Sequence, residues 1–206
     1  MGYSPGNPAR GALAALSLLV LLRPAAWADI PPGPRTPGDV SPLPVLGQVP
    51  DFHLRSLEGP GVRNRDLRGK LVLLAFACAS CADEPEEVAA TFARLQRALK
   101  ARGLFGKKVV LAIVVRHPER ESRTAFRAYA SRHGVDPHGW VILSGSPETT
   151  ARLRDRFERF GVANGEPPAD TRGRVFLVDS TGRVRRVYTV KTFQADAVLA
   201  DMERLL

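Results

Sequence analysis

The sequence contains little cysteine and no hydrophobic run long enough for a membrane span. Cys78 and Cys81 are its only cysteines among 206 residues, which excludes a small fold held together by many disulfides. The apolar run at residues 11–22 is shorter than the roughly 20 residues that a spanning helix needs. No glycine-rich phosphate loop or Ser-His-Asp order is present, so nucleotide-dependent and serine-hydrolase chemistry have no support.

The composition is that of an ordinary globular domain with a basic surface. Hydrophobic residues make up 44% of the chain and charged residues 25%, which predicts a single hydrophobic core. The formal charge is +9, but the basic residues are scattered among acids, so we expect no nucleic-acid partner. The charge instead fits an acidic partner or a peripheral membrane contact. We expect a monomer.

The first 28 residues have the order of an export signal. Arg10 precedes the apolar run, and Ala26-Trp27-Ala28 has the small-residue pattern of a cleavage site. We therefore expect cleavage before Asp29 and a periplasmic mature chain, with no cysteine at the new N-terminus to accept a lipid. Outside the reducing cytosol, two thiols can pair and stay paired.

The remainder divides into a proline-rich segment and one domain. Residues 29–50 contain too many prolines for a helix or a central strand, so we expect a linker or an arm that lies on the domain. Residues 51–206 alternate between strand and helix patterns. The expected strands are an alternating, edge-like one within residues 51–59 and others at 71–77, 107–116, 140–143, 175–178 and 184–190. The expected helices are at about 83–102, 122–133, 146–160 and 193–205.

This order predicts an α/β fold in which a parallel strand-helix-strand unit comes first and an antiparallel hairpin comes last. Both cysteines lie where the first buried strand, LVLLAFA, gives way to a helix start. The carboxyl edge of such a sheet is where sites form in open α/β folds. The pair Cys78 and Cys81 is therefore the candidate site.

Several stretches of this domain resemble the Sco/SenC family. They are DLRGKLVLLAF at 66–76, HPERES at 117–122, FRAYASRHGVDPHGWVILSG at 126–145 and FLVDSTGRVRRVY at 176–188. The resemblance implies a thioredoxin-like three-layer sandwich with a mixed central sheet. It also implies a role as a copper chaperone or thiol-disulfide factor in cytochrome c oxidase assembly. The implied partners are protein thiols or the copper-site subunit of a respiratory oxidase.

The sequence departs from the family pattern at the metal site. The first cysteine of the family's C-P-x-x-C-P motif corresponds to Cys81, and the second corresponds to Pro85. The family's copper-binding histidine corresponds to Thr171. Cys78 is an additional cysteine three residues upstream of Cys81.

Three interpretations of the pair stay open. In the first, Cys81 carries out thiol-disulfide exchange and Cys78 resolves the mixed disulfide, so the protein is an enzyme only in this case. In the second, both sulfurs bind Cu(I), the soft ion that thiolates select, with His117 as a further candidate ligand. In the third, the protein is a non-catalytic binding module that kept the fold.

Local features bear on these interpretations in opposite directions. A helix start after Cys81 favours a thiolate, whereas Asp83 and Glu84 in the same turn oppose one. A disulfide needs the two Cα atoms within about 7 Å, but extended chain would hold them about 10 Å apart. Pairing therefore requires a turn beginning near Ala79.

His117 is the candidate third ligand because it directly follows the second expected buried strand, KKVVLAIVVR at 107–116. That position puts it at the same sheet edge as Cys78. The other three histidines, His53, His133 and His138, are expected at the surface or in turns.

Overall fold

The computed structural model describes residues 1–2, 42–57, 59–81, 86–160 and 171–206. It divides the chain into two units, Met1–Val40 and Ser41–Leu206, and the second of these is described below. The predicted export signal and most of the predicted arm lie outside the described residues. The same holds for Asp83, Glu84 and Pro85 after Cys81 and for the acids Glu166 and Asp170 before Thr171.

Eight strands of the described chain form one mixed sheet. In chain order they are β1 (Gly47–Gln48), β2 (His53–Ser56), β3 (Gly61–Arg63), β4 (Leu71–Ala77), β5 (Val109–Val115), β6 (Trp140–Ser144), β7 (Val175–Val178) and β8 (Arg183–Tyr188). Their spatial order is β1-β8-β7-β4-β5-β6-β2-β3. The centre, β4-β5-β6, is parallel, and the pairs on either side of it are antiparallel. This arrangement confirms the predicted mixed sheet.

The two central strands have the sequence of strands covered on both faces. All seven residues of β4 and all seven of β5 are buried, which explains their continuous apolar runs. Their register pairs Leu71 with Val109 and continues to Ala77 with Val115. Both strands therefore end at the same edge, immediately before Cys78 and Arg116.

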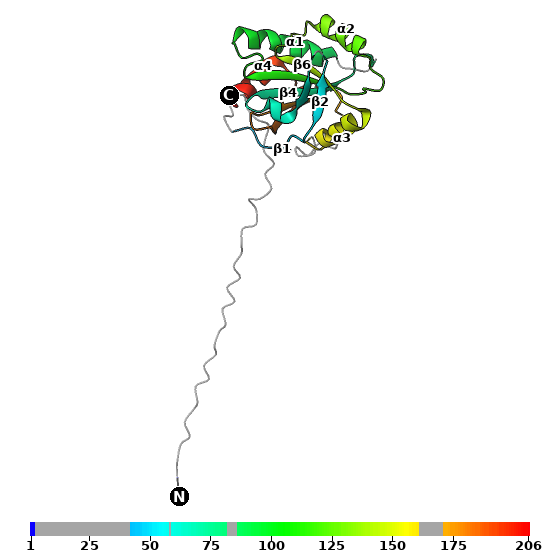
Figure 1. Cartoon of the computed structure of the whole chain (residues 1–206). Helices are drawn as coiled ribbons and strands as arrows, with labels where there is room; N and C mark the ends of the chain where they lie inside the picture. Colours follow the sequence, from blue (N-terminus) through cyan, green and yellow to red (C-terminus); the bar gives the residue numbers. More distant parts are fainter. Residues whose placement is uncertain (3–41, 58, 82–85, 161–170) are drawn as a thin grey trace. The chain divides into compact units, whose positions relative to one another are not determined.

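Four helices of the described chain cover the two faces of this sheet (Figure 1). They are α1 (Glu86–Ala101), α2 (Arg123–His133), α3 (Pro147–Glu158) and α4 (Ala195–Glu203). One core cluster joins α1, α2 and α4 to one face, and a second joins α3 to the other. The predicted three-layer sandwich is thus present, and α3 ends two residues before the predicted Phe160.

The helix boundaries follow the local chemistry of the chain. Ser122 and Ser146 cap α2 and α3, since each side chain accepts a hydrogen bond from the backbone N–H three residues later. Gly134 ends α2 in a left-handed conformation with φ of 62°. These caps place the loops that follow β5 and β6 at the carboxyl edge of the sheet.

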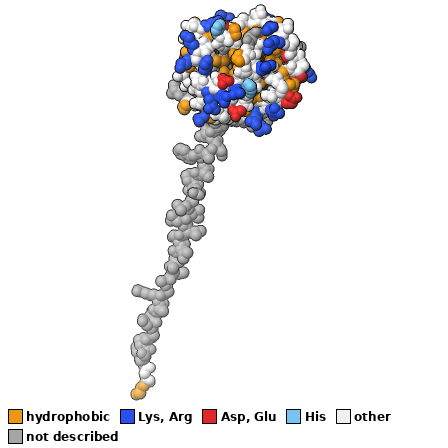
Figure 2. Space-filling model, in the orientation of Figure 1, with side chains coloured by type: hydrophobic (Ala, Val, Ile, Leu, Met, Phe, Trp, Pro, Cys, Tyr) orange, Lys and Arg blue, Asp and Glu red, His pale blue; other side chains and the backbone are white. Residues whose placement is uncertain are grey.

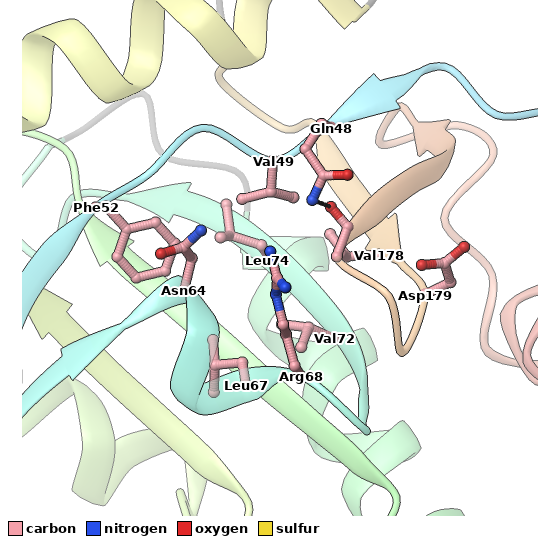
Figure 3. A pocket seen from close by; sticks show the side chains of 11 residues that line it. Gln48, Val49, Phe52, Asn64, Leu67, Arg68, Val72, Leu74, Val178 and Asp179 are labelled. Atoms are coloured by element: carbon pink, nitrogen blue, oxygen red, sulfur yellow. Dashed lines mark hydrogen bonds between the residues drawn. The ribbon is translucent and has the colours of Figure 1, made fainter.

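The chain before β4 packs along the sheet and adds elements that the sequence patterns did not predict. β1 pairs with the start of β8, and Leu43 and Val49 are buried. β3 pairs with β2 in antiparallel fashion, and a short 3-10 helix, η1 (Asn64–Leu67), follows β3. Figure 3 shows apolar side chains of this region, among them Phe52, around a cavity of about 20 Å³, which has room for about one water.

The surface has mixed charge. On the face drawn in Figure 2, Lys and Arg side chains are spread among acidic, polar and apolar ones. No helix in the described part of the chain is long and apolar enough to cross a membrane.

Candidate functional site

Cys78 and Cys81 form a disulfide at the carboxyl end of β4. The chain bends at Ala79 and Ser80 and brings the two Cα atoms to 5.5 Å, well below the distance of about 10 Å in extended chain. The turn that pairing required is therefore present.

The two sulfurs differ in their access to solvent. Cys78 is 2% exposed and belongs to the apolar end of β4, whereas Cys81 is half-buried and lines a cavity of about 400 Å³. Among the described residues, Cys81 is therefore the more accessible sulfur of the pair, and Cys78 is covered. This difference matches the division into an attacked sulfur and a resolving sulfur.

Glu121 contacts the buried sulfur. Its Oε1 lies 2.7 Å from Cys78 Sγ and accepts hydrogen bonds from Ser80 N–H at 3.1 Å and Ser80 Oγ at 2.7 Å. A disulfide sulfur has no proton to donate, so the contact with Cys78 becomes a hydrogen bond only when the thiol is present. Glu121 Oε2 is buried with no hydrogen-bond partner among the described residues.

These three residues also form a possible metal-binding group. One ligand atom from each of Cys78, Cys81 and Glu121 lies within 4.8 Å of the other two. Within the described ranges, no other group of three such side chains is this close. Two thiolates suit Cu(I), whereas a carboxylate oxygen is a hard ligand that suits it poorly.

His117 lies near this group but is not a member of it. It follows β5 as predicted and lines the same cavity as Cys81. Its Nδ1 is 3.4 Å from Glu119 Oε1, and its side chain is 31% exposed. The structure thus brings His117 to the cavity of Cys81, but its ring nitrogens lie outside the three-residue group.

Thr171 is the residue that the resemblance described above pairs with the family's copper-binding histidine. It is fully buried, and its Oγ1 has no hydrogen-bond partner in the described chain. A buried hydroxyl is not a soft ligand, so this position contributes none of the thiolate or imidazole chemistry that copper prefers.

The cavity above Cys81 is strongly basic. Its lining consists of Cys81, Arg116, His117, Arg120, Arg154, Glu158 and Arg172. Four arginines and one acidic residue are thus among the described residues that line it. Positive charge near a cysteine favours the thiolate over the thiol.

Sequence reasoning identified the two cysteines and His117 but missed Glu121 and the arginines. It considered only charges adjacent to Cys81 in the chain, where Asp83 and Glu84 dominate. Glu121 and Arg120 follow β5, whose carboxyl end lies beside that of β4. The parallel pairing of β4 with β5 could have predicted these residues, because it places the residues after β5 at the same sheet edge as the two cysteines.

The remaining histidines lie away from the disulfide. His133 ends α2, where burial lowers its pKa although the carboxylate of Glu86 acts in the opposite direction. His138 is exposed in the turn before β6 and contacts Asp136. His53, on β2, lines a separate cavity of about 510 Å³ whose wall includes Glu121.

Comparison with solved structures identifies related folds. A SCO1/SenC lipoprotein from Bacillus anthracis is 21% identical, with a TM-score of 0.60 over 77% of this chain and 95% of that one. BsSco, described as a Sco-family cytochrome c oxidase assembly protein with a disulfide switch, is 20% identical, with a TM-score of 0.62 over 80% and 98%. Copper-bound ScoI from Bradyrhizobium japonicum is 23% identical, with a TM-score of 0.57 over 77% and 99%.

At these identities the structures establish the thioredoxin-like fold. A comparison with curated protein sequences gives no match. A scan against protein families matches residues 46–206, nearly all of the described chain, to the family SCO1/SenC. The chain belongs to the SCO1/SenC family.

Proposed function

We propose that this protein is an exported thiol-disulfide exchange factor in respiratory cytochrome c oxidase assembly. The observation that carries the proposal is the Cys78–Cys81 disulfide, which has one covered sulfur and one sulfur that opens into a cavity. The description of BsSco as an oxidase assembly protein with a disulfide switch supports it. Family membership alone would not select this chemistry, because the second cysteine of the family motif is replaced by Pro85.

Exchange proceeds in two balanced steps. In the reduced protein, the Cys81 thiolate attacks a partner disulfide, forms a mixed disulfide and releases one partner thiolate. The Cys78 thiolate then attacks Cys81 Sγ, which forms the Cys78–Cys81 disulfide and releases the second partner thiolate. Two electrons pass to the partner, and the two protons from the cysteine thiols end on the partner thiols. The reverse direction oxidises a partner dithiol.

The surroundings of each sulfur suit its step. The guanidinium groups around Cys81 stabilise the attacking thiolate, and the cavity admits the partner. The Cys78 thiol has Glu121 Oε1 as a hydrogen-bond acceptor within 2.7 Å. The buried position of Cys78 keeps it from reacting with a partner directly, so Cys81 is the sulfur with which it exchanges.

Trapping of the mixed disulfide tests this proposal. Reduced Cys78→Ser protein, mixed with a disulfide-bonded peptide, is expected to accumulate a covalent adduct through Cys81, because the resolving sulfur is absent. Reduced Cys81→Ser protein is the matched control and is expected to form at least ten times less adduct. Equal adduct formation by the two variants, measured by intact-mass spectrometry, would sink the assignment of roles.

Copper transfer is the second candidate, favoured by the group of Cys78, Cys81 and Glu121. Copper would be the cargo, and the disulfide must first be reduced because only thiolates bind Cu(I). The copper-bound ScoI of Bradyrhizobium japonicum supports this candidate at the level of fold. Exchange is preferred because the third member of the group is a carboxylate and Thr171 offers no soft ligand.

A Cu(I) titration of the reduced protein against a chromophoric competitor separates the two candidates. Tight one-to-one binding that both Cys81→Ser and His117→Ala weaken would establish copper carriage with an imidazole ligand. Binding no tighter than that of an unrelated dithiol would remove the copper candidate.

Export and the binding-module alternative are tested in cells. The B. anthracis relative is described as a lipoprotein, which supports a location outside the cytosol for this fold. Cleavage before Asp29 is checked by the N-terminal sequence of the mature protein. Cys81→Ser is expected to abolish oxidase assembly, whereas a binding module that needs no thiol would retain it.

A further inference from the structure

The cavity above Cys81 carries more positive charge than exchange chemistry requires. Four of its seven lining residues are arginines, and Glu158 is the only acidic one among them. One nearby cation is enough to favour a thiolate. The others face the space that a partner must enter.

These arginines converge from three parts of the chain. Arg116 and Arg120 follow β5, Arg154 lies on α3, and Arg172 precedes β7. They line the same cavity as Cys81, so a partner that enters it to reach this sulfur meets arginines from each of these three parts.

Several described acids lie near two of these arginines. Arg154 is 3.7 Å from Glu158 and 3.8 Å from Asp155, and Arg120 is 4.0 Å from Glu119. The Arg120 side chain remains 78% exposed, so its guanidinium is presented to solvent. Arg116 is 4% exposed, and its Nη2 donates a hydrogen bond to the carbonyl of Phe76 at 3.2 Å. Its guanidinium group is therefore buried and held against β4.

The chemistry of arginine indicates what such a cavity accepts. A guanidinium binds a carboxylate through two parallel hydrogen bonds, and a group of them attracts acidic segments at a distance. A basic segment would be repelled, and a neutral one would leave these donors without new partners. With a volume of about 400 Å³, the cavity is larger than a single carboxylate needs.

We infer that the thiol partner of Cys81 is a protein segment whose reactive cysteines are flanked by Asp or Glu. The inference rests on the proposed exchange function and specifies its substrate class. The acidic side chains bind the arginines while a partner cysteine reaches Cys81 Sγ. In the direction seen from the oxidised protein, a partner thiolate forms a disulfide with Cys81, and Cys78 leaves as a thiolate. The second partner thiolate then attacks the partner sulfur of this mixed disulfide, which forms the partner disulfide and releases Cys81 as a thiolate.

Three synthetic dithiol peptides test this inference. They share one two-cysteine core and differ only in flanking residues, which are acidic, neutral or basic. The rate constant for reduction of the Cys78–Cys81 disulfide in the full chain is expected to be about tenfold higher for the acidic peptide than for the neutral one at low salt. The basic peptide is expected to be slowest. The differences should shrink as the ionic strength rises from about 0.01 M to about 1 M.

Two charge reversals locate the effect. Arg120→Glu is expected to remove most of the preference for the acidic peptide, read as the ratio of the acidic-peptide rate constant to the neutral-peptide rate constant, because a loss of thiolate stabilisation slows both peptides alike and cancels in the ratio. Lys107→Glu is the matched control. Lys107 is exposed before β5, at the opposite edge of the sheet, and its reversal should leave the preference intact.

The outcomes distinguish this inference from the proposed function. Equal rates for the three peptides, or an acidic preference that survives Arg120→Glu, would overturn the substrate class and leave exchange standing. No reduction by any of the peptides would instead overturn the exchange function on which the inference depends.

Discussion

At the scale of single residues, the contact between Glu121 and Cys78 connects the redox state of the pair to its surroundings. Glu121 Oε1 lies 2.7 Å from Cys78 Sγ and is held in place by the N–H and hydroxyl of Ser80. The carboxylate can accept a hydrogen bond from a Cys78 thiol but not from a disulfide. It therefore stabilises the reduced form of the protein relative to the oxidised form.

Glu121→Gln is expected to make the disulfide harder to reduce. The variant keeps an acceptor oxygen but loses its charge, and a charge-assisted hydrogen bond is stronger than a neutral one. The reduction potential at pH 7 should fall by about 20 mV, which corresponds to about 1 kcal/mol. The measurement is equilibration in glutathione buffers with quantification of both redox forms.

Glu119→Gln is the control for this experiment. Glu119 contacts His117 and Arg120 rather than Cys78, so its loss should change the potential much less. A less negative potential in Glu121→Gln would contradict the stabilisation of the reduced form. It would show that repulsion between the carboxylate and a Cys78 thiolate dominates.

At the scale of elements, the turn between α1 and β5 depends on a close approach of two backbones. A Cβ built on Gly106 would lie 2.2 Å from the carbonyl oxygen of His138, and one built on Gly139 would lie 2.6 Å from the amide nitrogen of Gly106. The backbone just before β6 therefore packs directly against this turn, and the contact requires glycine at both positions. This contact helps to align β6 with β5, and the candidate site lies at the carboxyl edge of these strands.

Gly106→Ala is expected to destabilise the protein by about 3 kcal/mol. About 1 kcal/mol follows from the left-handed backbone at φ of 70°, and the rest follows from the clash with His138. Gly103 is a matched control, because its φ is 67° but a Cβ there meets no atom within 4 Å. Gly103→Ala should cost only the backbone part in urea unfolding, and equal losses would contradict the role of the close approach.

The elements also show what the sequence could predict. The buried runs of β4 and β5 and the stripe of Val88, Phe92, Leu95 and Leu99 on α1 produce strong local patterns, so the central sheet and its covering helix were predicted correctly. β1 and β3 have two and three residues and depend on pairing with distant or hairpin partners. Such short strands have no periodicity of their own.

The same distinction applies to the candidate site. Cys78, Cys81 and His117 could be placed at one sheet edge because each follows a recognisable strand. The contact of Glu121 with Cys78 depends on how the loop after β5 folds back, which no local pattern records. The arginines around Cys81 come from three separate segments, so their convergence requires the completed fold.

At the scale of the whole molecule, a net charge of +9 makes the carboxylates that bind basic groups important for stability. Asp136 joins α1 to the loop before β6, since its Oδ2 is 2.5 Å from Lys100 Nζ and its Oδ1 accepts from His138. The Lys100 ammonium, followed by the hydrogen bonds from His138, holds the pKa of Asp136 well below its usual range. The folded state therefore favours the charged form of this side chain.

The sign of the pH dependence follows from that depressed pKa. The contribution of Asp136 is fully present above its unfolded pKa of about 3.9 and is lost as pH falls toward the lower folded value. Asp136→Asn is therefore expected to reduce the free energy of unfolding by about 1 kcal/mol at pH 7 and by clearly less at pH 3. Urea unfolding of both proteins at the two pH values measures the difference.

Asp155→Asn is the control for this experiment. The exposed carboxylate of Asp155 lies 3.8 Å from Arg154, so its loss should change stability little at either pH. A deficit in Asp136→Asn that is as large at pH 3 as at pH 7 would show that the ion pair with Lys100 is not its source.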